Sequence, residues 1–479
     1  TRYWRDWSSD VCSSDLDLYS ACIVTGGSLD IYSNSQYAFN WDTRGDCTEG
    51  LLHLGFPHHE EVLDKNESQY QVIDVGFALT STTRGKMSAY ATPRLRPTRW
   101  TMTEIGKIPV DGFFPPRDPD PSLVELFDLP GILETEIAEE FTLDNNSYYF
   151  TGKIIQKIAT QCLLATDKDI NSDQNLVQTC IHKLQQAFDD FLNNNMAYPL
   201  VYDQLYGGIV SSEGFSTKNV NADFGNTVYN DHHFHYGYWI MAGAILKKLD
   251  PAWTRIPELN NMISLLIRDV ANTNIALDPD FPLFRHFDWF AGHSSSHGLV
   301  PFVDGKDQES TSEEMNFHYA LMLWGKVSNK PELQSLGELM MKVNKRSVGS
   351  YLMMEDTNTV HPQIVPNKIV GIFFENKIDY TTWFGAQREY IHGIQVIPVS
   401  PINEFLRTEA FVREEWFSIL QDLDLIQNPD ANRHNSWQSL LFANYAVINK
   451  VEAMEQISLA TMDPGLSRAW ALYFAATRP

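Results

Sequence analysis

The sequence predicts a multi-domain protein in which a β-rich region precedes a larger helical region. Residues 17–110 contain short alternating segments, such as Tyr70–Leu79, that Gly, Asn and Pro interrupt. Residues 108–121 are rich in proline and form a natural connector. From Tyr148 onward, apolar residues recur at helical spacing. Successive helical hairpins of this kind predict a toroid or solenoid, in which loops gathered at one mouth supply a cleft.

Loops rich in Asp, Gly, His and Asn separate the predicted helices. The helical spacing covers the following ranges: Tyr148–Ala165, Leu176–Asn193, Tyr236–Leu249, Ile256–Ala271, Glu313–Val327, Pro331–Asn344, Glu404–Leu420 and Ser436–Asn449. We therefore divide the chain into a β domain (17–110), a linking region (111–147) and a helical domain (148–479).

The first residues of the chain need separate treatment. Residues 1–16 resemble a translated sequencing adapter, so we leave them out of the fold prediction and expect the natural N-terminus to be missing. Sequons at Asn66 and Asn145 permit secretion. The remaining cysteines fit either buried free thiols or two disulfides. They are Cys22, Cys47, Cys162 and Cys180.

The chain is strongly acidic. It has 479 residues, with 36 Lys and Arg against 61 Asp and Glu, which gives a formal charge of −25. Such a field repels phosphate backbones and anionic membranes, whereas a neutral polysaccharide is indifferent to it. Aromatic residues make up 12% of the chain; they fill cores by default and also stack on sugar rings. We therefore expect neither a nucleic acid nor a membrane as a partner.

One short segment, Asn230–Trp239, reads N-D-H-H-F-H-Y-G-Y-W and begins a predicted helix. On that helix Asp231, His235 and Tyr238 share one face. Asp231 could be a general acid whose proton is held by His235 in a poorly hydrated aromatic pocket. The alternative is a helix-capping aspartate beside partly buried histidines. A metal site is less consistent with the segment, because its three histidines match no common ligand spacing.

A second segment, Asp304–Asn316, reads D-G-K-D-Q-E-S-T-S-E-E-M-N. Glu309 and Glu313 are four residues apart at the start of a predicted helix, so both carboxylates face the same way. Like charges that close raise each other's pKa and can produce a group that takes a proton from water. The alternative is a capping box in which Ser310 precedes Glu313 by three residues. No signature of a nucleophilic serine or of a phosphate-binding loop occurs in the sequence.

Taken together, these segments resemble glycoside hydrolase family 81, the endo-β-1,3-glucanases. The resemblance covers the chain after the adapter-like residues, and its motifs follow in the same order. They are Gly55–His59, Val201–Ile209, Phe224–Tyr238, Arg285–Ser294, Asp304–Glu313, Thr381–Gly385, Tyr390–Gln395 and Ser467–Leu472. The resemblance implies an N-terminal β-sandwich, a small linking α/β region and a C-terminal (α/α)6 toroid. Because the β-rich region is too short for a whole sandwich, we expect its first portion to be lost.

The resemblance also implies hydrolysis with inversion of configuration. Asp231 matches the proton donor, and Glu309 and Glu313 match a pair in which one is the base and the other holds the water or orients the base. The sequence leaves this choice open and slightly favours Glu309. Substrate-binding residues implied by the resemblance are His235, Tyr238, Asp203, Asp288, His293, Trp383 and His392.

The expected partner is a β-1,3-glucan such as laminarin or curdlan, bound by a secreted or cell-wall-associated monomer. Neither a metal nor another cofactor is expected, because the acid activates the leaving group and the base activates water. Two alternatives remain at this point. One is a catalytically impaired glucan-binding fragment, and the other is a different glycan-processing toroid such as a polysaccharide lyase. An acidic chain with paired glutamates argues against the lyase.

Overall fold

The computed structural model describes residues 16–65, 72–92 and 98–479. Nearly all of the adapter-like segment, 1–15, and the sequon at Asn66 lie outside the described residues. Within the described residues, no helix combines the length and the apolar character that a membrane crossing requires.

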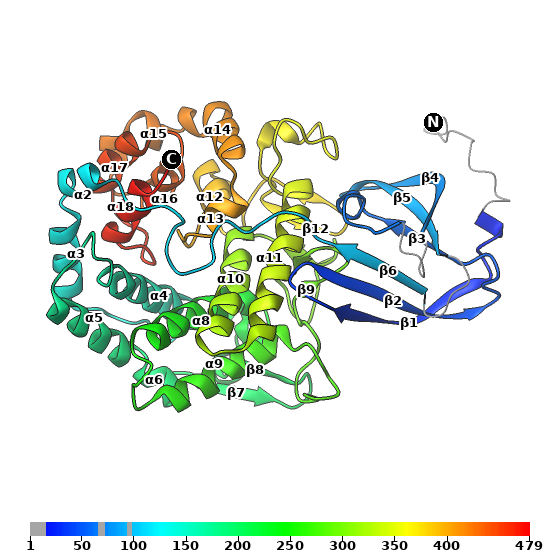
Figure 1. Cartoon of the computed structure of the whole chain (residues 1–479), viewed down its shortest axis with the longest axis horizontal. Coiled ribbons are helices and arrows are strands. Elements are labelled where there is room, and N and C mark those ends of the chain that lie inside the picture. The colour runs from blue at the N-terminus through cyan, green and yellow to red at the C-terminus, as the bar shows by residue number, and fades with distance from the viewer. Residues whose placement is uncertain (1–15, 66–71, 93–97) are drawn as a thin grey trace. The chain divides into compact units, whose positions relative to one another are not determined.

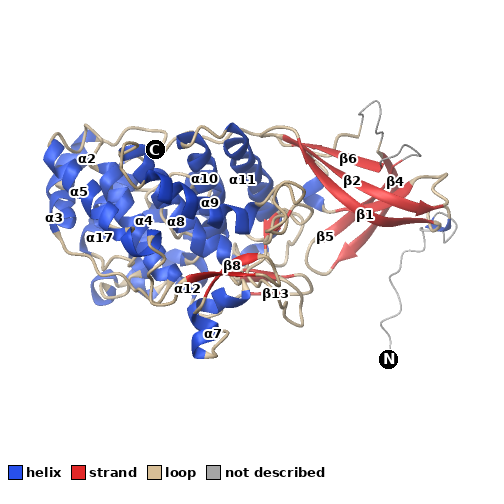
Figure 2. Cartoon of the chain, turned by 90° about the horizontal axis from the view of Figure 1, so that it is seen from below, coloured by secondary structure: helices blue, strands red, loops and turns tan. Residues whose placement is uncertain are grey.

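The chain divides into two compact units, which we call the β unit and the helical unit. The β unit contains the residues up to Lys107 together with Thr359–His361, and the helical unit contains Ile108–Asn358 and Pro362–Pro479. Strands dominate the first unit and helices the second (Figures 1 and 2). The predicted order of a β-rich region followed by a helical region is therefore confirmed.

The β unit consists of two antiparallel three-stranded sheets. In sheet order the strands are β1 (Cys22–Ile31), β2 (Gln36–Gly45) and β6 (Thr98–Thr103), and β3 (Leu51–Gly55), β5 (Gly85–Thr92) and β4 (Ile73–Ser81). Buried aromatic rings join the sheets: Trp100 of the first meets Tyr90 of the second edge to face, with ring centroids 5.7 Å apart. A disulfide between Cys22 and Cys47 links the start of β1 to the segment after β2.

The helical unit contains all the long helices of the described chain. They are α2 (Pro121–Leu126), α3 (Leu129–Ala138), α4 (Tyr148–Leu164), α5 (Gln174–Ala187), α6 (Asp189–Leu192), α7 (Glu213–Thr217), α8 (His232–Leu249), α9 (Ile256–Ala271), α10 (Thr311–Val327), α11 (Pro331–Tyr351), α12 (Arg388–Gly393), α13 (Asn403–Leu406), α14 (Glu409–Ser418), α15 (Asp424–Gln427), α16 (Trp437–Tyr445), α17 (Lys450–Leu459) and α18 (Arg468–Ala476). Short strand pairs lie in the loops between them: β7 (Leu200–Asp203) with β8 (Gly208–Ser211), β9 (Phe287–Asp288) with β10 (His293–Ser294), and β11 (Asp307–Gln308) with β12 (Ile372–Phe374) and β13 (Ile378–Asp379).

Helices α4, α8, α10 and α11 pack side by side and form the interior of the helical unit (Figure 1). Almost every residue of α8 and α10 is buried, which is the mark of helices enclosed on all sides rather than on one face. The two helices approach closely at Gly237, where a Cβ atom would lie 3.2 Å from the Cα of Phe317. This contact near the N-terminal ends brings the residues that begin α8 and α10 together.

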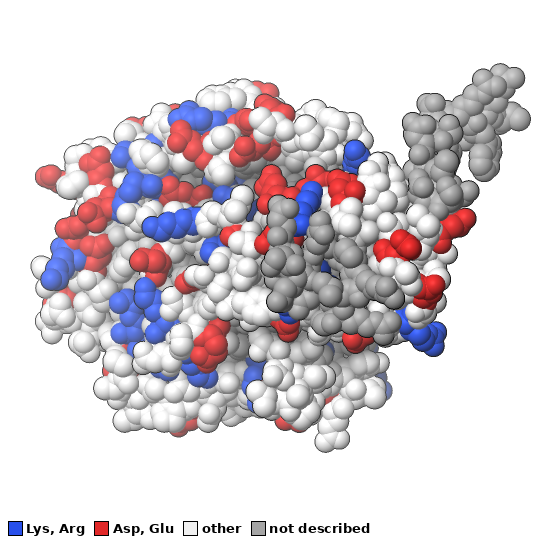
Figure 3. All heavy atoms as spheres, turned by 45° about the vertical axis from the view of Figure 1, so that its right-hand side comes forward, with Lys and Arg blue, Asp and Glu red and all other residues white. Residues whose placement is uncertain are grey.

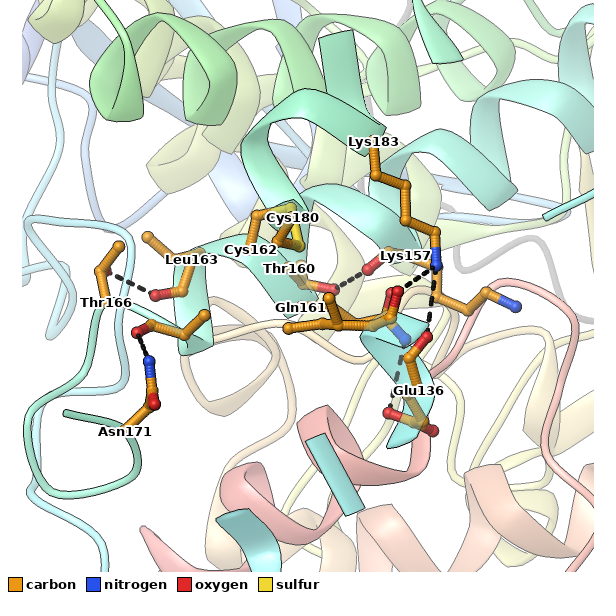
Figure 4. Close-up of a disulfide and its surroundings, with 12 residues drawn as sticks. Glu136, Lys157, Thr160, Gln161, Cys162, Leu163, Thr166, Asn171, Cys180 and Lys183 are labelled. Carbon is orange, nitrogen blue, oxygen red and sulfur yellow. Dashed lines mark hydrogen bonds between the residues drawn. A yellow bond between two sulfur atoms is a disulfide. The ribbon is translucent and has the colours of Figure 1, made fainter. Parts of the chain in front are cut away.

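Helices α3, α4 and α5 are tied together by covalent and polar links (Figure 4). A disulfide joins Cys162 of α4 to Cys180 of α5, so both cysteine pairs are disulfides rather than free thiols. One turn further along α5, the ammonium of Lys183 donates to three carbonyl groups at the end of α3. These links hold α4, which carries residues of the site described below, against its neighbours.

Two predicted helices are wrong in their continuity. The range Leu176–Asn193 divides into α5 and α6 at Phe188, and the division of the other is larger. The range Glu404–Leu420 divides into α13 and α14, because the backbone leaves the helical conformation at Arg407 (φ −104°, ψ 89°). The side chain of Arg407 is almost fully buried and donates to the carboxylate of Glu415 and to the amide oxygen of Asn444. A buried arginine needs such partners, and this tertiary requirement overrides the helical periodicity.

Charged side chains are spread over the surface. On the face that Figure 3 shows, acidic side chains lie among basic and uncharged ones, and the described residues of that face form no continuous basic area.

Candidate active site

Asp231 lies in the N-cap position of α8, in the left-handed backbone region with φ of 58°. Aspartate adopts this conformation more readily than most residues. Its N–H donates to the carbonyl of Ser296 over 2.8 Å, and its carbonyl accepts the N–H groups of Phe234 and His235. The side chain makes no capping hydrogen bond to α8. The backbone of Asp231 therefore starts the helix, while its carboxyl points to other partners.

The carboxyl group of Asp231 is surrounded by other carboxyl groups. Burial raises its pKa well above the usual range, and the charges of Asp307, Glu309 and Glu313 raise it further. A hydrogen bond with Ser296 offsets these effects only in part. Such surroundings favour the protonated form of a carboxyl, which is the form that can donate a proton to a substrate.

Glu309 lies between β11 and α10 and is half-buried. Its Oε1 accepts the backbone N–H of Trp383 over 2.8 Å, and its carbonyl accepts the side-chain amide of Gln395 over 2.5 Å. Burial raises the pKa of Glu309 to about 7; the Trp383 hydrogen bond lowers it, and the charges of Glu313 and Asp307 raise it. Near neutral pH this carboxyl is partly ionised and can accept a proton from water.

Glu313 lies in the first turn of α10 and is 3% exposed. The hydroxyl of Tyr238 donates to its Oε1 over 2.6 Å. Burial raises the pKa of Glu313, whereas the charge of Lys153 and the hydrogen bond from Tyr238 lower it. The residue before α10, Ser310, makes no capping hydrogen bond and instead donates to the carbonyl of Ile394. The predicted capping alternative therefore does not describe this helix start.

The two glutamates differ in their access to solvent and in their hydrogen bonds. Glu309 is half-buried, and one of its carboxyl oxygens has a backbone donor. Glu313 is almost fully buried and accepts a short hydrogen bond from a tyrosine of the neighbouring helix. A base that deprotonates water must reach that water, so the geometry favours Glu309 as the base and Glu313 as its fixed neighbour.

Comparison with known proteins identifies the family. Residues 8–118 match the glycosyl hydrolase family 81 N-terminal domain, and residues 128–472 match the family 81 C-terminal domain. The chain belongs to glycosyl hydrolase family 81. The resemblance inferred from the sequence motifs is thereby confirmed.

Three fungal relatives are about one-third identical in sequence to this family 81 chain over the aligned residues. A glucan endo-1,3-beta-D-glucosidase of Arthroderma benhamiae is 35% identical over 96% of the chain and 50% of its own length. The primary septum glucan endo-1,3-beta-D-glucosidase of Schizosaccharomyces pombe is 34% identical over 96% of the chain and 45% of its own length. Glucan endo-1,3-beta-D-glucosidase 2 of Saccharomyces cerevisiae is 33% identical over 95% and 58%. The chain thus spans about half the length of these relatives.

A solved structure supports the fold. A glycoside hydrolase family 81 protein from Clostridium thermocellum superposes with a TM-score of 0.75 at 19% sequence identity. The match covers 98% of this chain and 62% of that one. At this identity the likeness bears on the fold alone, and it agrees with a β-rich region followed by a helical one.

The histidines of the family 81 motif at Asn230–Trp239 do not act as we predicted. The nearest hydrogen-bonding group to the ring of His235 is the amide of Asn226, at 3.5 Å, and the ring packs 5.0 Å from Tyr149. Burial lowers the pKa of His235 well below its usual value, so the ring is neutral. The predicted contact between the His235 ring and the proton of Asp231 is therefore replaced by the contact of Asp231 with Ser296.

The other histidines of this motif also turn to separate partners. The Nδ1 of His232 lies 2.6 Å from the carboxylate of Asp269, and its Nε2 lies 2.9 Å from the carbonyl of Asn226. The ring of His233 lies against that of His286, with centroids 4.7 Å apart. Across the described ranges, no group of three or more His, Cys, Asp or Glu side chains is arranged to hold a metal ion.

Asp203 lies at the end of β7 and accepts a hydrogen bond of 2.9 Å from the hydroxyl of Tyr229. The ring of Tyr229 is covered by the guanidinium of Arg285, at 4.0 Å from the ring centroid. The Arg285 side chain also donates to the carbonyl of Gly207 over 2.5 Å. Asp203 therefore belongs to a cluster that fixes the β7–β8 hairpin beside the start of α8.

The remaining residues implied by the resemblance lie in different settings. Asp288 is exposed and accepts the N–H groups of Phe290 and Ala291, which holds a turn. His293 is buried, and its Nδ1 lies 2.8 Å from the carbonyl of Ser294. The Asp288 side chain thus holds its own turn, and the His293 ring holds the backbone next to it.

Trp383 and His392 differ in their exposure to solvent and in their hydrogen-bond partners. The side chain of Trp383 is 45% exposed and its backbone N–H binds Glu309, so its ring is accessible next to that carboxylate. His392 is fully buried, with Nδ1 at 2.7 Å from Glu415 and Nε2 at 2.8 Å from the hydroxyl of Tyr380. With both ring nitrogens occupied, His392 supports the loop that carries Trp383 rather than meeting a ligand directly.

Three residues of the site were missed in the sequence analysis. Asp307 contributes to the raised pKa of Asp231, and Tyr149 and Lys153 of α4 act on Glu313. Two signals could have found them. Asp307 stands two residues before Glu309, so both side chains lie on one side of an extended strand, and Tyr149 and Lys153 are four apart on one helix face.

Proposed function

We propose that this chain hydrolyses β-1,3-glucan at internal linkages with inversion of configuration. Asp231 is the general acid, Glu309 is the general base, and Glu313 holds the base or the attacking water. The names of the fungal relatives, glucan endo-1,3-beta-D-glucosidases at 33–35% identity, support the substrate and the reaction. The helices are proposed to complete the (α/α)6 toroid implied by the family resemblance.

The proposal rests on the surroundings of Asp231 and Glu309, one of which must be protonated and the other ionised. An inverting glycosidase needs one carboxyl that is protonated and a second that is ionised in the same cleft. Burial and the neighbouring carboxyl groups raise the pKa of Asp231 well above its usual range, which favours the protonated form that an acid needs. The pKa of Glu309 is raised to about 7, so part of this carboxyl is ionised near neutral pH, as a base requires.

Each catalytic residue moves one proton in the proposed reaction. Asp231 gives its proton to the oxygen of the scissile bond, and this oxygen keeps the electron pair of the breaking C–O bond. Glu309 takes a proton from a water molecule, whose oxygen bonds to the anomeric carbon from the opposite side. A β-linkage therefore yields a product in the α configuration.

The binding residues and the setting of the protein are part of the same proposal. The exposed ring of Trp383 is a surface on which a sugar can stack beside the base. Six further residues are proposed to shape the cleft, mostly by holding its loops: Asp203, His235, Tyr238, Asp288, His293 and His392.

We also propose a monomer that is secreted or associated with the cell wall. Two disulfides support an oxidising compartment, and one relative is named for the primary septum.

The test compares wild-type protein with Asp231→Asn and Glu309→Gln on laminarin, curdlan and mixed-linkage glucan. We expect each substitution to reduce the release of oligosaccharides from linear β-1,3-glucan by at least about 1000-fold, the scale of a lost general acid or base. Affinity electrophoresis in laminarin should show retained binding. Glu332→Gln, at an exposed position of α11, is the control and should keep full activity.

The products of the wild-type protein distinguish the alternatives. Proton NMR of the first product should show the α-anomer, and a β-anomer would mean retention. An unsaturated sugar would identify a lyase, and binding without any product would identify an impaired glucan-binding fragment. Full activity of Asp231→Asn would rule out the acid assignment.

A further inference from the structure

Asp307 is a buried carboxylate between the acid and the base that the mechanism above does not use. It lies in β11, and its side chain is fully buried. Its Oδ1 lies 2.7 Å from Nδ1 of His297, and its Oδ2 accepts the indole N–H of Trp383 over 3.2 Å. Each carboxylate oxygen thus has its own donor, which is what a buried carboxylate requires.

Trp383 connects Asp307 to the base through two different N–H groups. Its backbone N–H donates to Glu309 over 2.8 Å, and its indole N–H donates to Asp307. The Trp383 ring stacks on that of Phe302, with centroids 4.7 Å apart, and meets the ring of His297 edge to face, with centroids 5.3 Å apart. Trp383 is therefore held at two points, its indole by Asp307 and its backbone by Glu309.

Asp307 is also connected to the acid through the main chain of one residue. The N–H of Asp231 donates to the carbonyl of Ser296, and the N–H of Ser296 donates to the carbonyl of Asp307 over 2.7 Å. The position of Asp307 is thereby linked by hydrogen bonds to the backbone of the acid on one side and to the carboxylate of the base on the other.

We propose that Asp307 is a positioning residue of the active site, which orients Trp383 against the base and places a fixed negative charge beside the acid. The proposal rests on the catalytic roles of Asp231 and Glu309 proposed above. The charge of Asp307 is the strongest electrostatic contribution to the raised pKa of Asp231, ahead of Glu309 and Glu313. The other charged or titratable groups that contact these carboxyls include His297 next to Asp307, and Lys153, Tyr238 and Tyr149 next to Glu313.

The substitution Asp307→Asn tests the need for a carboxylate at this position. Asparagine keeps the shape but offers one acceptor oxygen, so it can bind both Trp383 and His297 only if Nδ1 of His297 accepts from the asparagine amide, and its charge is lost. We expect kcat/KM on a laminari-oligosaccharide to fall by about 10-fold to 100-fold, mainly through kcat, because a small displacement of a catalytic group has effects of this size. The alkaline limb of the pH profile should move to lower pH, because the acid loses its proton more easily without the neighbouring charge.

Trp383→Phe and the double variant show whether Asp307 acts through the indole. Phenylalanine keeps an aromatic ring at this half-exposed position but removes the indole N–H together with part of the stacking surface, so the variant should fold even where Asp307→Asn does not. We expect Trp383→Phe to lower kcat/KM, and Asp307→Asn to add clearly less in that background than in the wild type. Asp304→Asn, an exposed acidic residue of the same segment that pairs with Lys377, is the matched control and should leave activity unchanged.

Two outcomes would overturn the positioning role. One is a loss of activity in Asp307→Asn that only follows the loss of folded protein on thermal unfolding, with the pH profile unchanged. The other is full additivity of the two substitutions. Both leave the proposed function intact if wild type hydrolyses the glucan and Asp231→Asn does not. Absence of hydrolysis by wild-type protein would instead reject the proposed function, and the role of Asp307 with it.

Discussion

The helical unit contains two kinds of buried carboxylate, and their surroundings differ. Asp269 and Glu415 are fully buried, and each has a histidine and an arginine as partners. Burial raises the pKa of Asp269, but His232 and Arg285 outweigh it and hold the pKa below the usual value. In the same way, Arg407 and His392 outweigh the effect of burial on Glu415.

At the candidate active site, Asp231 has other carboxyl groups as neighbours, whereas Asp269 and Glu415 have histidine and arginine. Burial raises the pKa of Asp231, and three further carboxyl groups raise it more. Only Glu313 has a cation among its neighbours, Lys153, and its pKa is still raised. Burial raises the pKa of the carboxyl groups in both regions, and the charge of the neighbours decides whether the pKa ends below or above its usual value.

The largest expected change in the free energy of unfolding follows from removing the charge of a structural carboxylate. Glu415→Gln leaves the buried guanidinium of Arg407 without an ionised partner, and removal of one member of a buried pair costs about 3–5 kcal/mol. Urea denaturation at pH 7, followed by circular dichroism, should show this decrease in the free energy of unfolding. The exposed Glu332→Gln serves as the control and should change it by less than about 0.5 kcal/mol. A similarly small change in Glu415→Gln would remove the distinction between the two regions.

The substitution Asp231→Asn at the acid is expected to raise the free energy of unfolding, whereas Glu415→Gln lowers it. Because the pKa of Asp231 is raised on folding, the folded protein binds this proton more tightly than the unfolded chain does. This group favours folding only at low pH, and its contribution is lost as the pH rises towards its raised pKa. Asp231→Asn removes the penalty and should raise the free energy of unfolding at pH 7 by about 1–2 kcal/mol.

The stabilisation by Asp231→Asn should depend on pH. It should disappear below about pH 4, where both the folded and the unfolded wild-type protein are protonated at this position. Thermal unfolding of the variant and the wild type at pH 7 and at low pH measures the difference. Equal stability of the two proteins at pH 7 would mean that Asp231 is as well compensated as Asp269.

The smallest effect is expected in the pH dependence of activity. The base must be ionised, so kcat/KM should fall as the pH drops through about 7, the raised pKa of Glu309. Glu313→Gln removes a charge that raises this pKa, and the residual activity should show the acidic limb at a pH lower by roughly half a unit to one unit. An acidic limb that stays in place would mean that Glu309 does not control it.

Local periodicity predicted most long helices but not all of their ends. The range Ile256–Ala271 agrees with α9, whereas α8 starts at His232 rather than Tyr236. The reason is that the sequence His232–His235 lacks an apolar stripe, and its histidines become core residues only when the neighbouring helices cover them. Likewise, α11 continues past Asn344 to Tyr351, because Asn344 and Ser347 are fully buried by tertiary contacts.

By itself, the sequence determined the residue types of the site and their order along the chain. Asp231 and the Glu309–Glu313 pair stand out from local spacing and from motifs that resemble one family. Only the tertiary structure decided their partners, since Tyr238 reaches Glu313 across 75 residues of sequence and Trp383 reaches Glu309 across 74. The pKa of a carboxyl depends on burial and on charges within a few ångströms, and neither can be read from neighbours along the chain. For that reason Asp307 was overlooked in the sequence, and the contact of the His235 ring with Asn226 was not foreseen.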